Sequence, residues 1–124
     1  MTGFMTVYGE TIPADMLTNR LEKLTNQFYK ILPLRENGVE TLPEYMKSLM
    51  AEMLGAKDLI DALRNDAIYL TLLSILSYLI SYDCDVDTVR REVFKALSLI
   101  KKITDKYKSG YYEGEADYGR VGDI

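Results

Sequence analysis

Basic side chains concentrate in one segment of the chain, residues 88–108. This segment has seven basic and two acidic residues, although the whole 124-residue chain carries a net charge of −4. A basic helix face can hold a phosphate-rich ligand, a nucleic-acid backbone or an acidic protein surface. The alternative interpretation, which we favour, is a solvated face, since charge runs of this size are common on exposed helices. The candidate anion site comprises Arg90 and the helically spaced Arg91, Lys95, Lys102 and Lys106.

A second group of side chains could bind through hydroxyl groups and aromatic rings. Between residues 67 and 82, five hydroxyl-bearing residues fall on one side of a predicted helix, opposite leucines and isoleucine. One interpretation is close packing inside the bundle, and we favour it because a central helix is surrounded by others. The other is a homodimer interface or a ligand groove, because tyrosine combines a large contact area with a polar tip. The residues are Thr71, Ser74, Tyr78, Ser81 and Tyr82.

The groups that most enzymes need are missing. The sequence contains no histidine and a single cysteine, Cys84. Histidine is the commonest general base and metal ligand, so Ser-His-Asp triads, Cys-His pairs and Cys/His zinc sites are excluded within one chain. No glycine-rich phosphate-binding loop is present either. We therefore expect a protein that is not an enzyme and that holds neither a cofactor nor a metal.

One acidic run resembles half of a calcium-binding loop. Asp83, Asp85 and Asp87 have the spacing of the first three ligands of such a loop. However, the sixth position holds Thr88 instead of glycine, and the twelfth holds Phe94 instead of a bidentate glutamate. The favoured interpretation is that these acids cap the positive end of the following helix.

Hydrophobic periodicity predicts an all-α fold, a compact bundle of four to five helices. The longest lie near residues 12–32, 42–54, 66–82 and 86–108, with a short helix within 57–64. No segment alternates with a period of two, so we expect no strand. The predicted core comprises Leu21, Leu24, Phe28, Met46, Leu49, Leu73, Leu76, Val93, Leu97 and Ile100.

Turn and capping residues set the expected boundaries of these helices. Pro33 should end the first helix, and Gly55 and Gly110 should end the second and the last. Thr41 and Glu44 have the spacing of a capping box at the start of the second helix. Further boundaries are expected at the Asn37-Gly38 turn, near Thr11 with Pro13 in the first helical turn, and at a cap formed by Asn65 or Asp66.

These elements divide the chain into three parts. Residues 1–10 are expected to form a flexible N-terminal arm, 11–109 the helical bundle domain, and 110–124 an acidic, tyrosine-rich C-terminal tail that is disordered in isolation. The tail could also fold back on the basic segment.

Composition indicates a cytoplasmic protein without a membrane partner. Hydrophobic residues make up 48% of the chain, enough for a core without disulfides. A lone cysteine fits a reducing compartment, and the first residues lack the pattern of a signal peptide. The most apolar segment, residues 67–80, is shorter than the roughly 20 residues that a membrane span needs.

Three stretches show a resemblance to known proteins: NQFYKILPLRENG at 26–38, YLTLLSILSYLI at 69–80 and RREVFKALSLIKK at 90–102. Together they resemble small all-helical proteins of unknown function from phages and mobile elements of Gram-positive bacteria. The resemblance covers about a third of the chain and includes no catalytic motif, so it transfers no functional residue. It implies an accessory protein, such as an inhibitor of a bacterial defence system of the anti-CRISPR kind.

We therefore expect a non-enzymatic interaction protein that acts by binding another protein and that can form a homodimer. Two alternatives stay open. The first is a small-ligand binder, such as a sponge for a cyclic nucleotide signal, in which the basic residues hold the phosphates. The second is a nucleic-acid-binding subunit that uses the basic last helix.

Overall fold

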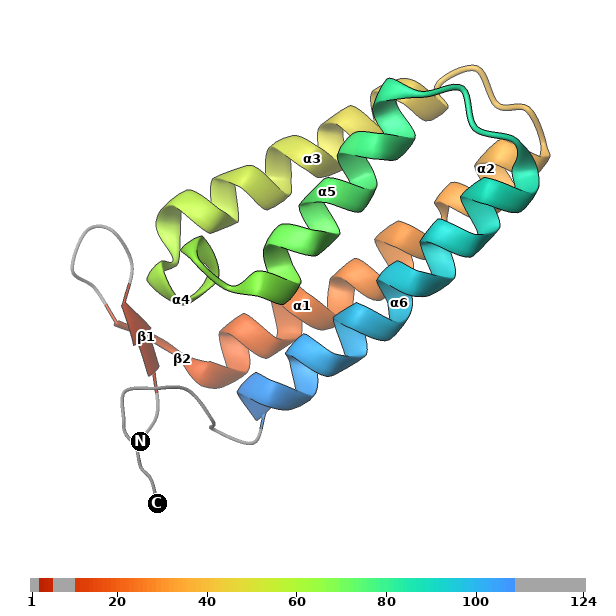
Figure 1. Cartoon of the computed structure of the whole chain (residues 1–124). Helices are drawn as coiled ribbons and strands as arrows, with labels where there is room; N and C mark the ends of the chain where they lie inside the picture. Colours follow the sequence, from red (N-terminus) through yellow and green to blue (C-terminus); the bar gives the residue numbers. More distant parts are fainter. Residues whose placement is uncertain (1–2, 6–10, 109–124) are drawn as a thin grey trace.

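A computed structural model of the chain describes residues 3–5 and 11–108 (Figure 1). Most of these residues are helical, and the predicted all-α bundle with four long helices is confirmed. The elements are β1 (Gly3–Met5), β2 (Thr11–Pro13), α1 (Ala14–Tyr29), α2 (Ile31–Glu36), α3 (Leu42–Leu59), α4 (Asp61–Arg64), α5 (Ala67–Ser81) and α6 (Val86–Lys108).

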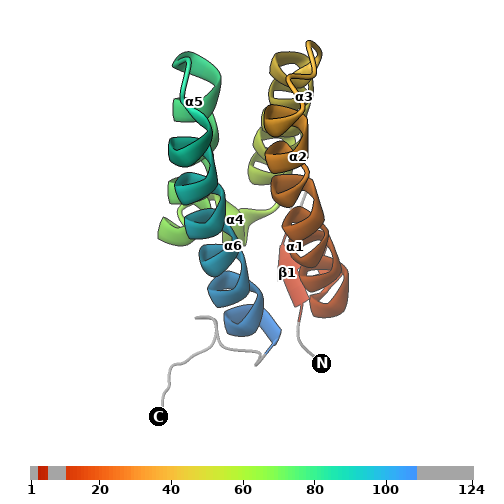
Figure 2. The same cartoon turned by 90° about the vertical axis from the view of Figure 1, so that its right-hand side faces the viewer.

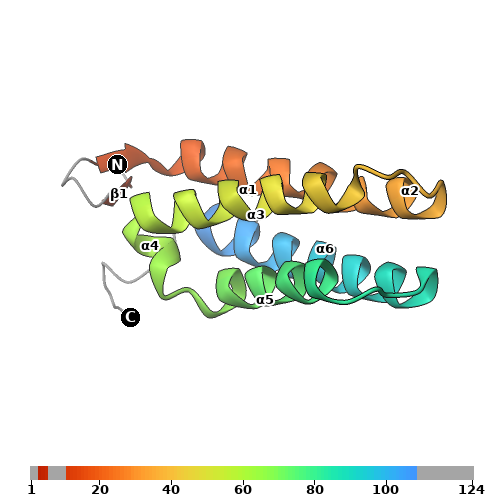
Figure 3. The ribbon, with the colours of Figure 1, turned by 90° about the horizontal axis from the view of Figure 1, so that it is seen from above.

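The long helices α1, α3, α5 and α6 lie along a common direction, and each runs antiparallel to the previous one (Figure 1). Figure 2 shows α5 and α6 on one side of the molecule and α1, α2 and α3 on the other. α1 packs on α6, α6 on α5, and α5 on α3, whereas α1 and α3 scarcely contact each other. The strands and α4 lie at one end of the bundle, and α2 lies at the other (Figure 3).

The two short strands correct the expectation that the chain has none. β1 pairs antiparallel with β2, with Phe4 opposite Ile12, and β1 contacts α4. Three residues are too few to show a period-two pattern, so sequence periodicity could not predict these strands. The first helix consequently begins at Ala14, and Pro13 has an extended backbone (φ −65°, ψ 147°) at its N-cap instead of lying in the first turn. Of the expected arm, residues 3–5 form β1, and residues 6–10 lie outside the described part.

Two predicted helix ends are wrong. Pro33 lies in the first turn of α2, where its missing N–H leaves no helical hydrogen bond unmade. The chain between α1 and α2 stays helical at Lys30 (φ −59°, ψ −22°). Gly55 lies inside α3, which continues to Leu59, because burial of Ala56 extends its apolar side. The predicted short helix within 57–64 is thus divided between the end of α3 and α4.

The capping predictions have mixed outcomes. Asp66 caps α5, since its carboxylate accepts a hydrogen bond from the Tyr69 N–H at 3.0 Å, as predicted. Thr41 is the N-cap of α3 but makes no side-chain bond there, because its backbone (φ −87°, ψ 6°) lacks the extended conformation of a capping side chain. Gly38 has the positive φ of 64° that its predicted turn requires. The predicted stop at Gly110 lies outside the described residues.

The apolar stripes of the four long helices meet in a single core. Nine of the ten predicted core residues are buried, and Leu97 is partly buried. Among residues 13–108, other fully buried side chains include Leu17, Ile31, Leu63, Tyr69 and Ile103.

None of the helices within the described ranges combines the length and hydropathy of a membrane span.

Candidate functional site

The hydroxyl-bearing side of α5 lies on the outside of the molecule. α5 packs against α3 and α6, which flank it, so its remaining side faces outward. The expectation that this side packs internally is therefore wrong: α5 is flanked by two helices and not surrounded. We call this surface the α5 face. Its residues, all exposed, are Thr71, Ser74, Tyr78, Ser81 and Tyr82.

Two tyrosines form the aromatic part of the α5 face. The rings of Tyr78 and Tyr82 lie 5.1 Å apart between centroids, with an interplanar angle of 40°. Tyr78 is 41% exposed and Tyr82 is 63% exposed. The electrostatic influence of the nearby Cys84 side chain, followed by a hydrogen bond between the two side chains, raises the pKa of Tyr78 above its ordinary value. The pair offers a large, uncharged aromatic area to a partner.

The α5 face is also free of charge. No Asp, Glu, Lys or Arg occurs between Asp66 and Asp83. Charged residues normally make up about a quarter to a third of an exposed protein surface. Protein–protein interfaces, by contrast, have few charged residues at their centre and are rich in tyrosine. The composition of the α5 face is therefore that of an interface.

The basic residues at the two ends of the candidate anion site point to different helices. Arg90, near the start of α6, forms ion pairs with Glu36 of α2 at 3.1 Å and with Asp87 at 3.0 Å. Lys106, near the end of α6, forms an ion pair with Asp66 at the start of α5 at 2.7 Å. The structure therefore does not bring all five predicted residues together, and these two hold α6 against its neighbours.

The other three predicted cations lie exposed in the middle of α6. Arg91 and Lys95 both lie near the carboxylate of Glu92, at 3.5 and 3.6 Å. Lys102 is exposed and forms no ion pair within residues 13–108. Since Glu92 partly neutralises two of the three cations, this part of α6 has the character of the solvated face that we favoured.

Asp66 lies at the centre of a buried polar cluster that the sequence did not reveal. Its side chain is 1% exposed and accepts hydrogen bonds from the Lys106 ammonium and the Tyr107 hydroxyl, each at 2.7 Å. Burial alone would raise the pKa of Asp66, but the hydrogen bonds from Lys106, Tyr69 and Tyr107 outweigh it and lower that pKa. The cluster joins the start of α5 to the end of α6.

The acidic run before α6 acts as a cap, as predicted. The Asp85 carboxylate accepts a hydrogen bond from the Thr88 N–H at 2.8 Å. A hydrogen bond from the Thr88 side chain, and then this one from the Thr88 N–H, lower the pKa of Asp85. Within the described ranges, no three Cys, Asp or Glu side chains gather where they could hold a metal ion.

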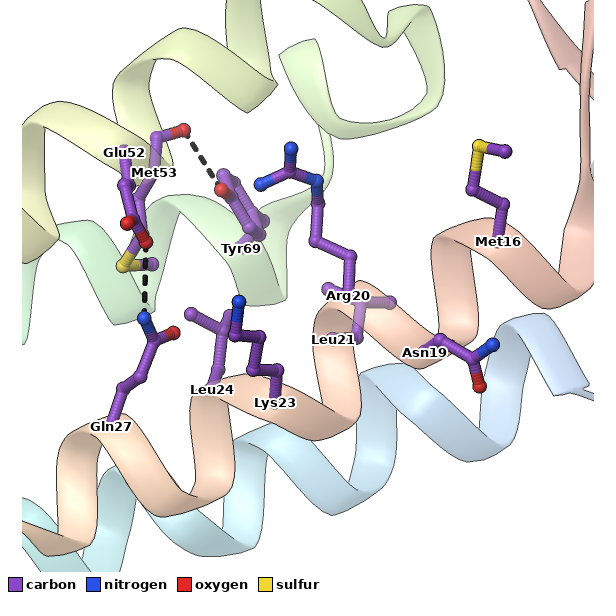
Figure 4. A pocket seen from close by; sticks show the side chains of 10 residues that line it. All are labelled: Met16, Asn19, Arg20, Leu21, Lys23, Leu24, Gln27, Glu52, Met53 and Tyr69. Atoms are coloured by element: carbon purple, nitrogen blue, oxygen red, sulfur yellow. Dashed lines mark hydrogen bonds between the residues drawn. The ribbon is translucent and has the colours of Figure 1, made fainter.

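A cleft of about 430 Å³ opens between α1 and α3 (Figure 4). We call it the α1–α3 cleft. One wall consists of Met16, Arg20, Lys23 and Gln27, which recur on α1 at spacings of four, three and four. This row of residues lies beside the buried row of the same helix. The opposite wall comes from α3, and Tyr69 of α5 lies at the back. The lining residues are Met16, Asn19, Arg20, Leu21, Lys23, Leu24, Gln27, Glu52, Met53 and Tyr69.

Hydrogen bonds across the α1–α3 cleft replace apolar packing. The Gln27 side-chain amide donates to the Glu52 carboxylate at 3.0 Å, and the Tyr45 hydroxyl donates to the Gln27 carbonyl at 2.7 Å. The Tyr69 hydroxyl donates to the Met53 carbonyl at 2.8 Å, and burial raises its pKa. Tyr69 is therefore a neutral group at the back of the cleft.

No protein-family model, no curated protein and no solved structure matches this chain. The features of the molecule that bear on its function are the α5 face, the cations of α6 and the α1–α3 cleft.

Proposed function

We propose that this protein is a non-enzymatic interaction protein that binds another protein through the α5 face. The observation that carries the proposal is an exposed helix side without a single charged residue. An uncharged surface that stays in water contributes nothing to stability or solubility. In a protein–protein interface, the same surface can be buried against a partner without removing a charge from water.

Tyr78 and Tyr82 are the expected energetic centre of this interface. Tyrosine is enriched among the residues that dominate binding energy, and such residues cluster near the centre of a contact. The small hydroxyl groups of Ser74 and Ser81 beside the rings allow a partner backbone to approach closely. We expect each tyrosine-to-alanine change to weaken binding by about 2 kcal/mol, or roughly 30-fold.

A finer form of the proposal concerns the partner. The resemblance to phage and mobile-element proteins implies an inhibitor of a bacterial defence system, and the partner would then be a component of that system. An inhibitor of this kind needs only a surface that blocks its target. The α5 face could serve as such a surface.

The two alternative functions have weaker support. Nucleic-acid binding through α6 would need its cations free, but Arg90 and Lys106 are paired within the fold. A phosphate site on α6 meets the same objection, because Glu92 competes for Arg91 and Lys95.

The test measures whether partner capture depends on the α5 face. Wild-type protein, the double variant Tyr78→Ala/Tyr82→Ala and the control Tyr29→Ala are each used as bait in a bacterial lysate. Tyr29 is a suitable control because it is a 53% exposed tyrosine on α1. We expect one protein to be retained in stoichiometric amount by the wild type and Tyr29→Ala, and lost from the double variant.

Two results would contradict the proposal. The first is capture that is equal for all three baits, which places binding elsewhere. The second is a purified chain that converts a substrate. The native mass of the purified protein is measured in parallel, and a dimer that requires Tyr78 and Tyr82 would identify the partner as a second copy.

A further inference from the structure

We propose that the α1–α3 cleft binds a small amphipathic anion, a molecule with an apolar body and one carboxylate or phosphate group. The site is separate from the proposed protein interface, since no residue of the α5 face lines it. Three observations support this: the unfilled space, its apolar wall, and an arginine that forms no ion pair or hydrogen bond within the described residues.

The first observation is that the bundle is not closed between α1 and α3. The other three pairs of adjacent long helices pack against each other, whereas α1 and α3 scarcely contact each other. In a four-helix bundle this boundary is normally filled by apolar side chains. Here it is bridged by hydrogen bonds of Gln27 and Tyr45. The resulting volume of about 430 Å³ lies within the range of small-molecule sites, so it suits a small molecule and not a folded partner.

The second observation is the apolar inner wall. Leu21, Leu24 and Met53 line the α1–α3 cleft with aliphatic and thioether groups. Met16 is 56% exposed and stands at the rim, where a flexible thioether adapts to the shape of a bound body. The Tyr69 hydroxyl is engaged by the Met53 carbonyl, so it is not available to compete for a ligand's polar group.

The third observation is Arg20. Every other arginine within residues 13–108 has an ion pair or a hydrogen bond to a carbonyl, and Arg20 has neither. Figure 4 shows its side chain extending from α1 toward Tyr69. An arginine directed into a cleft without a carboxylate partner is the usual element for binding a carboxylate or phosphate through two parallel hydrogen bonds.

The charge of the α1–α3 cleft favours one anionic group. Lys23 lies one turn after Arg20 and forms no ion pair in the described part of the chain. The one acidic side chain in the lining is Glu52, and the Gln27 amide already engages it. Two cations against one carboxylate leave a net charge of +1, which a single anionic group neutralises.

The experiment uses a fluorescent probe that has this chemistry. 8-Anilinonaphthalene-1-sulfonate is an apolar ring system with one anionic group, and N-phenyl-1-naphthylamine has the same body without the charge. Each probe is titrated into the wild type, Arg20→Gln, Lys23→Gln and Lys47→Gln. Lys47 is the matched control, because it is an exposed lysine of α3 without an ion pair in the described part and it does not line the cleft.

We expect the sulfonate probe to bind the wild type and Lys47→Gln equally, and Arg20→Gln about tenfold more weakly. Lys23→Gln should lose a smaller factor, because its ammonium makes a point-charge contact. The neutral probe should bind all four proteins alike. The far-UV circular dichroism of each variant is recorded, since this sulfonate also binds partly unfolded chains. Should Arg20→Gln lose structure, Lys23→Gln provides the same comparison.

Competition distinguishes the two headgroups. Displacement of the probe by decanoate identifies a carboxylate ligand, and displacement by 1-naphthyl phosphate identifies a phosphate ligand. Displacement by neither, or equal binding of the sulfonate probe to the wild type, Arg20→Gln and Lys23→Gln, would overturn the proposal. Tyr78→Ala/Tyr82→Ala should leave probe binding unchanged, so failure of this site and failure of the protein interface are distinguishable.

Discussion

Replacing Asp66 with asparagine tests whether the buried Asp66 cluster holds α5 against α6. Asparagine has the same shape and can still accept the hydrogen bond from the Tyr69 N–H that caps α5. It removes the negative charge that pairs with the Lys106 ammonium at 2.7 Å. The substitution therefore separates the ion pair from the cap.

The structure sets the expected magnitude. Removing one partner of a buried ion pair destabilises a protein by about 3–5 kcal/mol, because the other charge stays behind without compensation. The charge left here is that of Lys106, whose side chain is 33% exposed and also lies over the Tyr107 ring at 5.2 Å, so the loss of Asp66 is partly compensated. We therefore expect the low end, about 3 kcal/mol for Asp66→Asn. Asp66→Ala also removes the cap and should cost about 1 kcal/mol more.

The assay is urea denaturation followed by circular dichroism, with Asp61→Asn as the control. Asp61 also pairs with a basic residue, Arg64 at 3.1 Å, but the two side chains are 46% and 41% exposed. Exposed pairs of this kind contribute about 0–1 kcal/mol. If Asp66→Asn lowered the unfolding free energy by no more than Asp61→Asn does, the Asp66–Lys106 pair would not stabilise the fold and our reasoning would be wrong.

Further measurements test the pH dependence of Asp66, the burial of Leu76 and the contact between Arg35 and Cys84. The pKa of Asp66 is lower in the folded protein than in the unfolded chain. Its contribution to stability is therefore complete above the unfolded pKa of about 4 and is lost as the pH falls through the lower pKa of the folded state. The difference in unfolding free energy between the wild type and Asp66→Asn should shrink accordingly in acid titrations. Leu76→Ala, at a fully buried position, should destabilise by about 2–5 kcal/mol in urea denaturation, and a loss below about 1 kcal/mol would contradict a central α5. Arg35→Leu should cost about 1–3 kcal/mol by the same assay, since the Arg35 guanidinium donates two hydrogen bonds to the Cys84 carbonyl, at 3.2 and 3.0 Å.

The sequence was sufficient to predict the helices and most of the core, because these depend on local patterns. The buried residues of α6 recur every three or four positions, so Val93 and Ile100 were identifiable from spacing alone. Asp66 and Asp85 could be predicted as caps because a capping bond joins residues three apart. Gly55 and Pro33 misled the prediction, since a glycine or a first-turn proline is tolerated within a helix when burial on either side favours continuation.

The candidate sites depend on contacts between distant residues, which no local pattern reports. Lys106 was interpreted as part of an anion site, yet its partner Asp66 lies 40 residues earlier in the chain. The α1–α3 cleft depends on which helices fail to pack, and that follows from the arrangement of the whole bundle. One feature of the sequence does indicate the cleft. A second row of residues on α1 has the same spacing as the core row, namely Met16, Arg20, Lys23 and Gln27. Spacing alone, however, does not show whether such a row lines a cleft, contacts another helix or faces solvent.

The distribution of charge links the two proposed sites. At both ends of α6, basic side chains are paired with acids of other helices, as Arg90 is with Glu36 and Lys108 with Glu22 at 2.6 Å, so they contribute to holding the fold. α5 has no charge to contribute, and its exposed side can bind a partner without breaking any ion pair. Arg20 is the opposite case, since it lines a cleft and forms no ion pair or hydrogen bond within the described residues. The contacts within the described residues explain neither the uncharged face nor this arginine, and we therefore propose that each binds another molecule.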